Sequence, residues 1–147
     1  MPEAYAQTRS GNPFPIRSYT MALPPGDAGV RLTVELMMRK VHGTEGAQHP
    51  GIRAFALRAI EGTADRDDRA QAAAIFQAVK SHVRYIGEEG ETVQTPWLTL
   101  QLAAGDCDDH TTLLVALLRS VGIPARIETV ALDRSRQFVH VYALAGA

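Results

Sequence analysis

The feature that most constrains this chain is a single cysteine at the start of an apolar helix. Cys107 is the only cysteine in 147 residues, and it follows Gly105 and Asp106, a pair typical of a helix start. Apolar residues then recur at helical spacing, at positions 113, 114, 117, 118 and 121. We therefore predict a buried helix over 107–121 with an exposed first turn. Unpaired backbone N–H groups and the helix dipole at that end favour the thiolate, the nucleophilic form of cysteine.

The size and charge of the chain exclude several classes of protein. A length of 147 residues suits one domain, and a formal net charge of −1 leaves no electrostatic footprint for nucleic acid or for an anionic membrane. A single cysteine excludes an internal disulfide framework, and no apolar run approaches the ~20 residues of a membrane span. We expect a soluble protein of a reducing compartment, the cytoplasm.

The hydrophobic period divides the chain into an arm, a helical part and a hairpin. Residues 1–29 contain five prolines and three glycines, which predicts a loosely held arm with one short extended piece over 16–23. The predicted helices cover 30–42, 51–61 and 67–85, and a short helical turn begins at Pro96. The predicted hairpin has strands over 123–132 and 137–144, joined by a polar turn at 133–136. This order indicates an α+β domain over 30–147, with the cysteine helix packed on the sheet.

A cysteine nucleophile needs a base, and two histidines are candidates. His110 lies one helical turn after Cys107, so its ring points along the same surface. His140 lies in the middle of the returning strand, which can hold an imidazole against the helix, and we favour it. The alternative for His140 is a ring buried in the sheet and bonded elsewhere. The other three histidines are expected to face solvent or to lie in the C-terminal turn of a helix: His42, His49 and His82.

Three segments together resemble the transglutaminase-like superfamily. They are Gly105-Asp106-Cys107, the joint Ser120-Val121-Gly122-Ile123-Pro124-Ala125-Arg126, and the strand Phe138-Val139-His140-Val141-Tyr142. The resemblance covers about residues 75–144 and implies a papain-like core that uses a cysteine, a histidine and an acid in chain order. It implies Cys107 as the nucleophile and His140 as the base.

The third catalytic member of that family, an acid on the strand after the histidine, has no counterpart before the chain ends at Ala147. Three explanations stay open: a chain truncated at its C-terminus, which we favour, a site that works as a dyad, or lost catalysis.

Further residues are candidates for contact with a substrate. The backbone N–H of Cys107 is the first expected oxyanion donor, and Gln101, six residues upstream, matches the glutamine of papain-like enzymes. Gln101 is otherwise a surface residue of a short helix. Trp97 is either a core anchor or a wall of the cleft. Asp106 and Tyr142 are also expected to border the substrate.

Three carboxylates beside the thiol oppose the thiolate. Each would cost it about 1 kcal/mol at ~4 Å in water. The simplest reading is structural: Asp106 caps the helix, while Asp108 and Asp109 complement its dipole. The resemblance offers a second reading, because periplasmic cysteine proteases of the superfamily bind calcium with acids that flank their cysteine. We expect no cofactor, with calcium at these three acids as the alternative. A zinc site from Cys107, His110 and His140 is weaker, since no second ligand pair has zinc-like spacing.

Two functions remain open at this point. The first is a cysteine hydrolase or acyltransferase that attacks an amide of a peptide or protein and forms a thioester on Cys107. Hydrolysis is preferred over cross-linking, because nothing in the sequence builds a second, amine-binding site. The second is a non-catalytic interaction module of a bacterial or phage assembly, such as a virion, with residues 1–29 as the docking arm.

Overall fold

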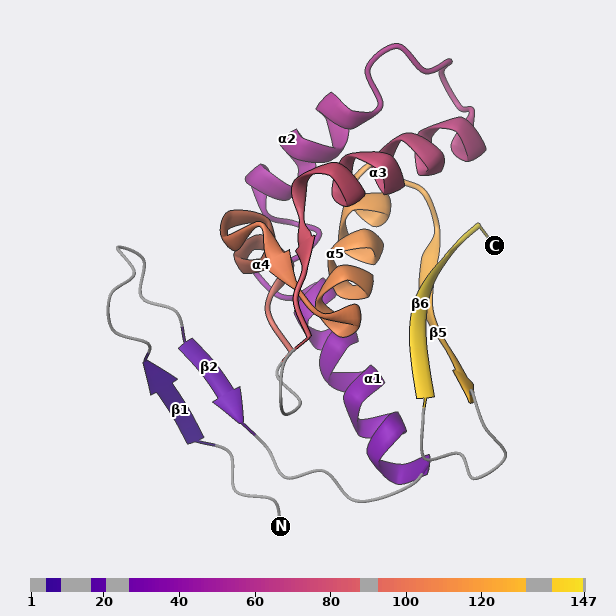
Figure 1. Cartoon of the computed structure of the whole chain (residues 1–147). Coiled ribbons are helices and arrows are strands. Elements are labelled where there is room, and N and C mark those ends of the chain that lie inside the picture. The colour runs from indigo at the N-terminus through magenta and orange to yellow at the C-terminus, as the bar shows by residue number, and fades with distance from the viewer. Residues whose placement is uncertain (1–4, 9–16, 21–26, 88–92, 132–138, 147) are drawn as a thin grey trace.

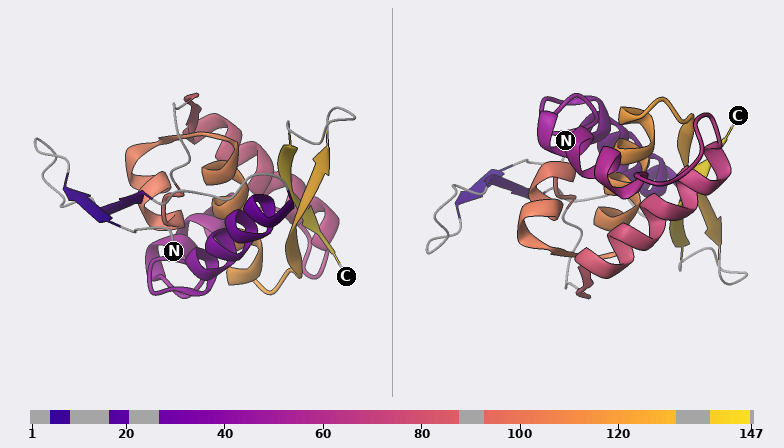
Figure 2. Two further views of the ribbon diagram at one scale, coloured as in Figure 1. Left: turned by 90° about the horizontal axis from the view of Figure 1, so that it is seen from below. Right: turned by 90° about the horizontal axis from the view of Figure 1, so that it is seen from above.

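The helix that begins at Cys107 lies at the centre of the structure (Figure 1). The computed structural model describes residues 5–8, 17–20, 27–87, 93–131 and 139–146. This helix, α5 (Cys107–Ser120), contacts the other four helices and the C-terminal hairpin. Those elements are α1 (Asp27–His42), α2 (Pro50–Ala59), α3 (Asp68–His82), α4 (Pro96–Leu102), β5 (Ala125–Ala131) and β6 (Val139–Ala145). Helix α4 and the hairpin lie on opposite sides of α5 (Figure 2).

The described strands form three two-stranded sheets. Strands β1 (Tyr5–Thr8) and β2 (Arg17–Thr20) are antiparallel, as are β5 and β6, whereas β3 (Arg84–Tyr85) and β4 (Ala104–Gly105) are parallel. In the β5–β6 hairpin Val130 is paired with His140, and Ala125 with Ala145. The short β3–β4 pair matters most for the site, because only Asp106 separates β4 from Cys107.

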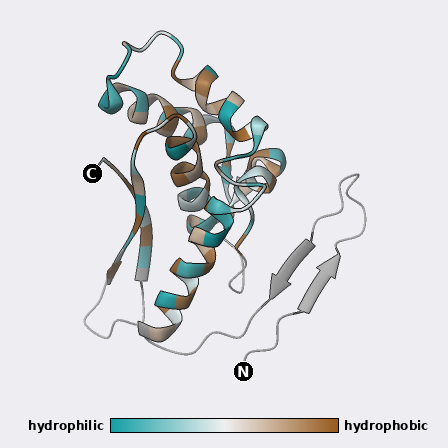
Figure 3. Ribbon diagram, turned by 180° about the vertical axis from the view of Figure 1, so that it is seen from behind, coloured by the Kyte–Doolittle hydropathy of each residue, from teal (hydrophilic) through white to brown (hydrophobic). Residues whose placement is uncertain are grey.

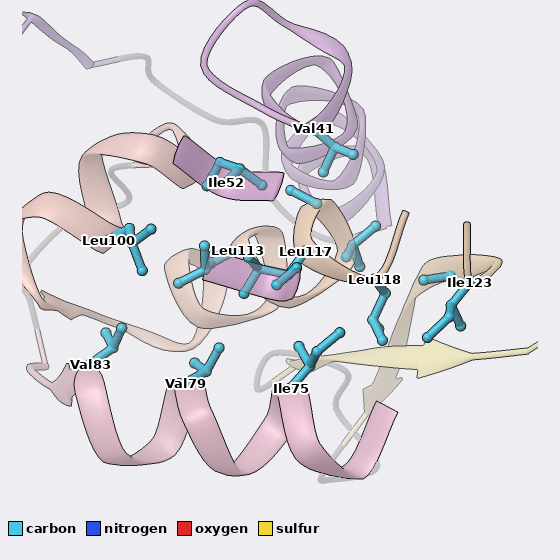
Figure 4. Packing of buried hydrophobic residues seen from close by; sticks show 14 residues of the cluster. Val41, Ile52, Ile75, Val79, Val83, Leu100, Leu113, Leu117, Leu118 and Ile123 are labelled. Atoms are coloured by element: carbon cyan, nitrogen blue, oxygen red, sulfur yellow. The ribbon is translucent and has the colours of Figure 1, made fainter. Parts of the chain in front are cut away.

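The hydrophobic core is built around α5. Leu113, Leu117 and Val115 are 0% exposed, and Ile75, Val79 and Val83 of the α3 segment point at this helix (Figure 4). Burial of each leucine contributes roughly 1.5–3 kcal/mol relative to an exposed side chain. Met37 is also fully buried, and its flexible side chain fills the core.

The predicted α+β architecture is confirmed, and the boundaries of its elements differ in places. Helix α1 begins at Asp27 and not at 30, and Gly29 is buried within its first turn, where its carbonyl accepts a hydrogen bond from the Thr33 hydroxyl. Helix α3 ends at His82 and not at 85, because Val83 has extended backbone angles and the next two residues form β3. The predicted turn at 133–136 lies outside the described residues.

The arm over 1–29 contains more regular structure than its composition predicts. Strand β2 falls within the extended piece expected over 16–23, but β1 was not predicted. Both strands have only four residues, so neither is long enough to show a clear hydrophobic period.

Helix α1 carries residues of both kinds, hydrophilic and hydrophobic, along its length. Hydrophilic and hydrophobic residues alternate along α1 (Figure 3). In the described part of the chain, no helix combines the length and the apolar character that crossing a membrane requires.

Replacement of Leu117 by alanine is expected to lower the free energy of unfolding by about 2–5 kcal/mol, because it opens a cavity beside fully packed neighbours. Leu57→Ala is the matched control: Leu57 is 45% exposed, so its loss should cost well under about 1 kcal/mol. Urea unfolding of both variants measures the difference. Equal losses in the two variants would contradict the central position of α5.

Candidate active site

A reciprocal capping box holds the start of the cysteine helix. The Asp106 Oδ1 accepts a hydrogen bond from the backbone N–H of Asp109 at 3.1 Å, and the Asp109 Oδ2 accepts one from the N–H of Asp106 at 3.1 Å. The predicted role of Asp106 as the helix cap is therefore confirmed. Cys107 follows as the first residue of α5.

The Cys107 thiol is half-buried and is stabilised in its neutral form. Its Sγ donates a hydrogen bond to the Asp108 Oδ1 at 3.7 Å. Burial, followed by the negative charges of Asp108 and Asp106, raises the pKa of the Cys107 thiol from 9.0 to about 11. The expectation that the helix start favours the thiolate is wrong for this conformation, because burial and the two carboxylates outweigh the helix N-terminus. At pH 7 only about one thiol in 10⁴ is then ionised.

Asp109 differs from the exposed first-turn acid that the sequence suggested. It is 0% exposed, and its Oδ1 accepts a hydrogen bond from the backbone N–H of Gln94 at 2.8 Å, in addition to the bond from Asp106. Burial raises the pKa of the Asp109 carboxyl to about 7, with a further contribution from the charge of Asp106. Asp109 therefore joins two chain segments and does not simply face the helix dipole.

The acids at this helix start do not form the calcium site considered above. Among the described residues, no three His, Cys, Asp or Glu side chains are grouped so that they could hold a metal ion. The same finding covers the weaker zinc set of Cys107, His110 and His140. The carboxylates of Asp106 and Asp109 are instead used by backbone N–H groups.

The structure brings the backbone of His140 close to the cysteine helix but turns its side chain away. The Val141 carbonyl accepts a hydrogen bond from the Thr111 hydroxyl at 3.4 Å, one turn along α5 from Cys107. Val141 is 6% exposed, and neighbouring residues of a strand point to opposite faces, so His140 lies on the outer face, where it is exposed. Within the described residues no hydrogen bond joins His140 to the Cys107 Sγ. The expected contact is not formed in this conformation.

His110, the other candidate base, lies on the same face of α5 as Cys107. Its ring is tilted against Tyr85 of β3, with ring centroids 5.9 Å apart. Its Nε2 is buried and has no hydrogen-bond partner among the described residues. An unpaired buried nitrogen is uncommon in proteins, so this imidazole retains an unused donor or acceptor close to the start of the helix.

The remaining predicted site residues lie in different surroundings. The Trp97 ring stacks on His49 with centroids 4.2 Å apart, and it occupies the space where a side chain at Gly51 would project. Trp97 thus anchors α4 to the start of α2, which supports the core-anchor reading. Gln101 is exposed on α4, and Tyr142 is 41% exposed on the outer face that carries His140.

His42 and His82 are exposed at the C-terminal ends of α1 and α3, as expected, whereas His49 is half-buried at the N-terminus of α2. The His49 Nδ1 accepts a hydrogen bond from the backbone N–H of Gly51 at 3.0 Å and so caps α2. The His82 Nε2 lies 3.0 Å from the Leu100 carbonyl oxygen. His42 is exposed at the end of α1, 3.5 Å from Arg119.

Gln94 is a residue of the site that sequence reasoning missed. Its Nε2 donates hydrogen bonds to the Thr99 Oγ1 and to the Ala104 carbonyl, both at 3.1 Å, while its backbone N–H is bonded to Asp109. It belongs to no helix or strand, so no period marks it. The only available signal is its place directly before Thr95 and Pro96, the start of α4.

Comparison with known proteins defines the family. A family description, the transglutaminase-like superfamily, matches residues 53–144, which is more than half of the chain. The chain belongs to this superfamily. The match includes Cys107 and His140.

Two solved structures share the fold of this superfamily member. One is a candidate cysteine protease from Cytophaga hutchinsonii, with a TM-score of 0.56 and 22% identity, covering 74% of this chain and 37% of that protein. The other is a candidate protease from Parabacteroides distasonis, with a TM-score of 0.61 and 12% identity, covering 97% of this chain and 34% of that protein. The chain thus spans about one third of the length of either protein. A search of curated proteins gives no match.

The raised thiol pKa predicts a distinct pH profile for alkylation by iodoacetamide. The rate should rise about tenfold per pH unit up to about pH 11, because only the thiolate reacts. Asp108→Asn removes one of the two charges and the hydrogen bond to Sγ, so we expect the rate at about pH 8 to rise roughly fivefold or more. Stopped-time mass spectrometry measures both. A wild-type midpoint at or below about pH 8.5 would contradict the assignment.

The buried Asp109 carboxyl predicts that stability depends on pH. The pKa of an aspartate carboxyl in water is 3.8, and that of Asp109 in the folded protein is about 7, so the folded protein binds the proton more tightly than the unfolded chain. The free energy of unfolding should therefore fall by a few kcal/mol as pH rises from about 4 to about 7, and level off above that. Asp109→Asn should remove this decline. Urea unfolding across that range tests it, and parallel curves for the two proteins would refute it.

Proposed function

We propose that this chain is the core of a cysteine-dependent amide hydrolase that acts on a peptide or protein. The observation that supports it most directly is the place of Cys107: the first residue of the central helix of a transglutaminase-like fold, half-buried and held by a capping box. A thiol at that place has its own backbone N–H available to a developing oxyanion. A bacterial cytoplasmic location fits the single cysteine.

The reaction proceeds by two acyl transfers. The Cys107 sulfur attacks the carbonyl carbon of the amide, and the resulting tetrahedral oxyanion collapses as the C–N bond breaks. The base passes the thiol proton to the leaving amine, and a thioester remains. Water then attacks the thioester, which releases the acid and restores the thiol. Because the resting thiol is neutral, the proton must leave during the attack and not before it.

We assign the role of base to His140. The bond between the Thr111 hydroxyl and the Val141 carbonyl places this part of β6 beside the first turns of α5. A contact between His140 and Cys107 requires a rotation of β6 that turns the His140 side chain from the outer face of the strand toward the thiol. His110 is the competing base, and its unpaired Nε2 is the observation in its favour.

A second function, a non-catalytic interaction module of a bacterial or phage assembly, is favoured by two observations. The Cys107 thiol has a pKa of about 11, so it is neutral at pH 7, and the His140 side chain lies on the outer face of its strand. Both are expected of a protein that does not use its thiol as a nucleophile. In that case residues 1–29 would form the docking arm, the protein would accompany a virion, and Cys107 would serve the fold alone.

The test is an assay of peptide-bond and glutamine-amide hydrolysis with denatured casein as the substrate, read by mass spectrometry. We expect new peptide termini or deamidated glutamines with the wild-type chain and none with Cys107→Ser. His140→Ala should lower the rate by about 10²–10⁴-fold, as loss of a general base does.

His42→Ala is the matched control, because His42 is exposed at the end of α1, and its rate should equal that of the wild type. Hydrolysis that survives Cys107→Ser would overturn the proposal, and so would a wild-type chain with no hydrolysis, which the interaction module predicts. Loss of activity in His110→Ala but not in His140→Ala would transfer the role of base to His110.

A further inference from the structure

The segment over 103–106, which contains β4 and precedes Cys107, is bonded to neighbouring segments at three successive carbonyls. The Ala103 carbonyl accepts a hydrogen bond from the Arg84 N–H at 2.8 Å, and the Gly105 carbonyl accepts one from the Ile86 N–H at 2.9 Å. Between them, the Ala104 carbonyl accepts the bond from the Gln94 Nε2 at 3.1 Å. The β3 segment and Gln94 therefore fix the path of the chain into the cysteine helix.

Asp109 also connects this segment to Gln94, through its carboxylate. Its carboxylate receives the backbone N–H of Gln94 at 2.8 Å and that of Asp106 at 3.1 Å. Gln94 is thus held at both ends, by Asp109 through its backbone and by Ala104 through its side chain. The result is a closed loop of hydrogen bonds around the residues that immediately precede the thiol.

The arrangement does more than helix capping requires. A capping box needs only the reciprocal bonds between the first residue of the box and the third residue of the helix, and that third residue is usually a glutamate or glutamine. Here the third residue is the shorter aspartate. It packs closely on the segment over 103–106, because a Cβ at Gly105 would lie 2.6 Å from the Asp109 Cβ. Its second oxygen then binds a segment outside the helix. A fully buried carboxylate is costly to desolvate, so a cap alone gives no reason for it.

We propose that Asp109 is a positioning residue for Cys107: together with Gln94 it clamps the segment over 103–106 and fixes the depth at which the thiol is buried. Burial is the largest cause of the raised pKa of Cys107, so this depth also sets the reactivity of the thiol. The catalytic meaning of the clamp rests on the proposed function, but its effect on the thiol does not.

The test is the pH profile of iodoacetamide alkylation in two clamp variants. Gln94→Ala removes the bonds to Ala104 and Thr99 without changing any charge. Asp109→Asn places a donor NH₂ where an N–H must be accepted, so one of its two bonds is lost. In both variants we expect the midpoint for Cys107 to fall from about 11 toward 9.0, and the rate at about pH 8 to rise at least tenfold.

The double variant and a control separate positioning from general stability. Because the two residues act through one loop, Gln94→Ala combined with Asp109→Asn should raise the rate by much less than the product of the single effects. Asp68→Asn is the matched control, an exposed aspartate in the first turn of α3, and it should leave the profile unchanged.

Unfolding midpoints of the same variants show whether each is folded at the assay temperature. If both clamp variants unfold at lower temperature but keep the wild-type alkylation profile, Asp109 and Gln94 serve only the fold and the inference is wrong. Should Asp109→Asn fail to fold, Gln94→Ala alone decides, since it keeps the carboxylate. Iodoacetamide needs no substrate site, so failure to hydrolyse casein would overturn the proposed function and leave this result intact.

Discussion

Burial of α5 between four helices and a hairpin is the constraint on which the rest of the structure depends. The helix has more fully buried side chains than one apolar stripe supplies, including Thr112 and Asp109 as well as Leu113 and Leu117. Four helices and a hairpin are needed to cover it, and each contributes a part of the core (Figure 4). A helix with this much buried surface cannot shift without disturbing all its neighbours, so its first residue has a fixed place in the fold.

The same burial decides the chemistry of the thiol. A helix start offers unpaired N–H groups and a partial positive charge, which favour a thiolate by roughly 0.3–1 kcal/mol at exposed sites. At Cys107 the opposing effects are larger, because the thiol is partly desolvated and two carboxylates lie in the same turn. Asp106 caps the helix, while Asp108 accepts the hydrogen bond of the thiol. The residue that caps the helix therefore also helps to keep its cysteine neutral.

The chain belongs to the transglutaminase-like superfamily, but this does not fix which side chains of strand β6 face the cysteine helix. The cysteine helix, the joint at Gly122 and the hairpin follow one another in the predicted order, and the hairpin packs on α5. Strand β6, however, turns Val141 inward and His140 outward. In a strand the side-chain period is two, so a register change of a single residue exchanges the two faces. The side to which His140 points is therefore decided by the register of β6 and not by the presence of the histidine in the sequence.

The sequence by itself determined the elements that carry a clear local signal. Apolar residues at helical spacing predicted the buried helix after Cys107, the Asp106 cap followed from residue type, and alternation predicted the hairpin. Only the tertiary structure decided what those residues face. The closed loop through Gln94, the burial of Asp109, the parallel pairing of two-residue β3 and β4, and the outward side of His140 all depend on contacts between segments far apart in the chain. Such contacts leave no period in a sequence, because each is set by how whole elements pack and not by the residues next to it.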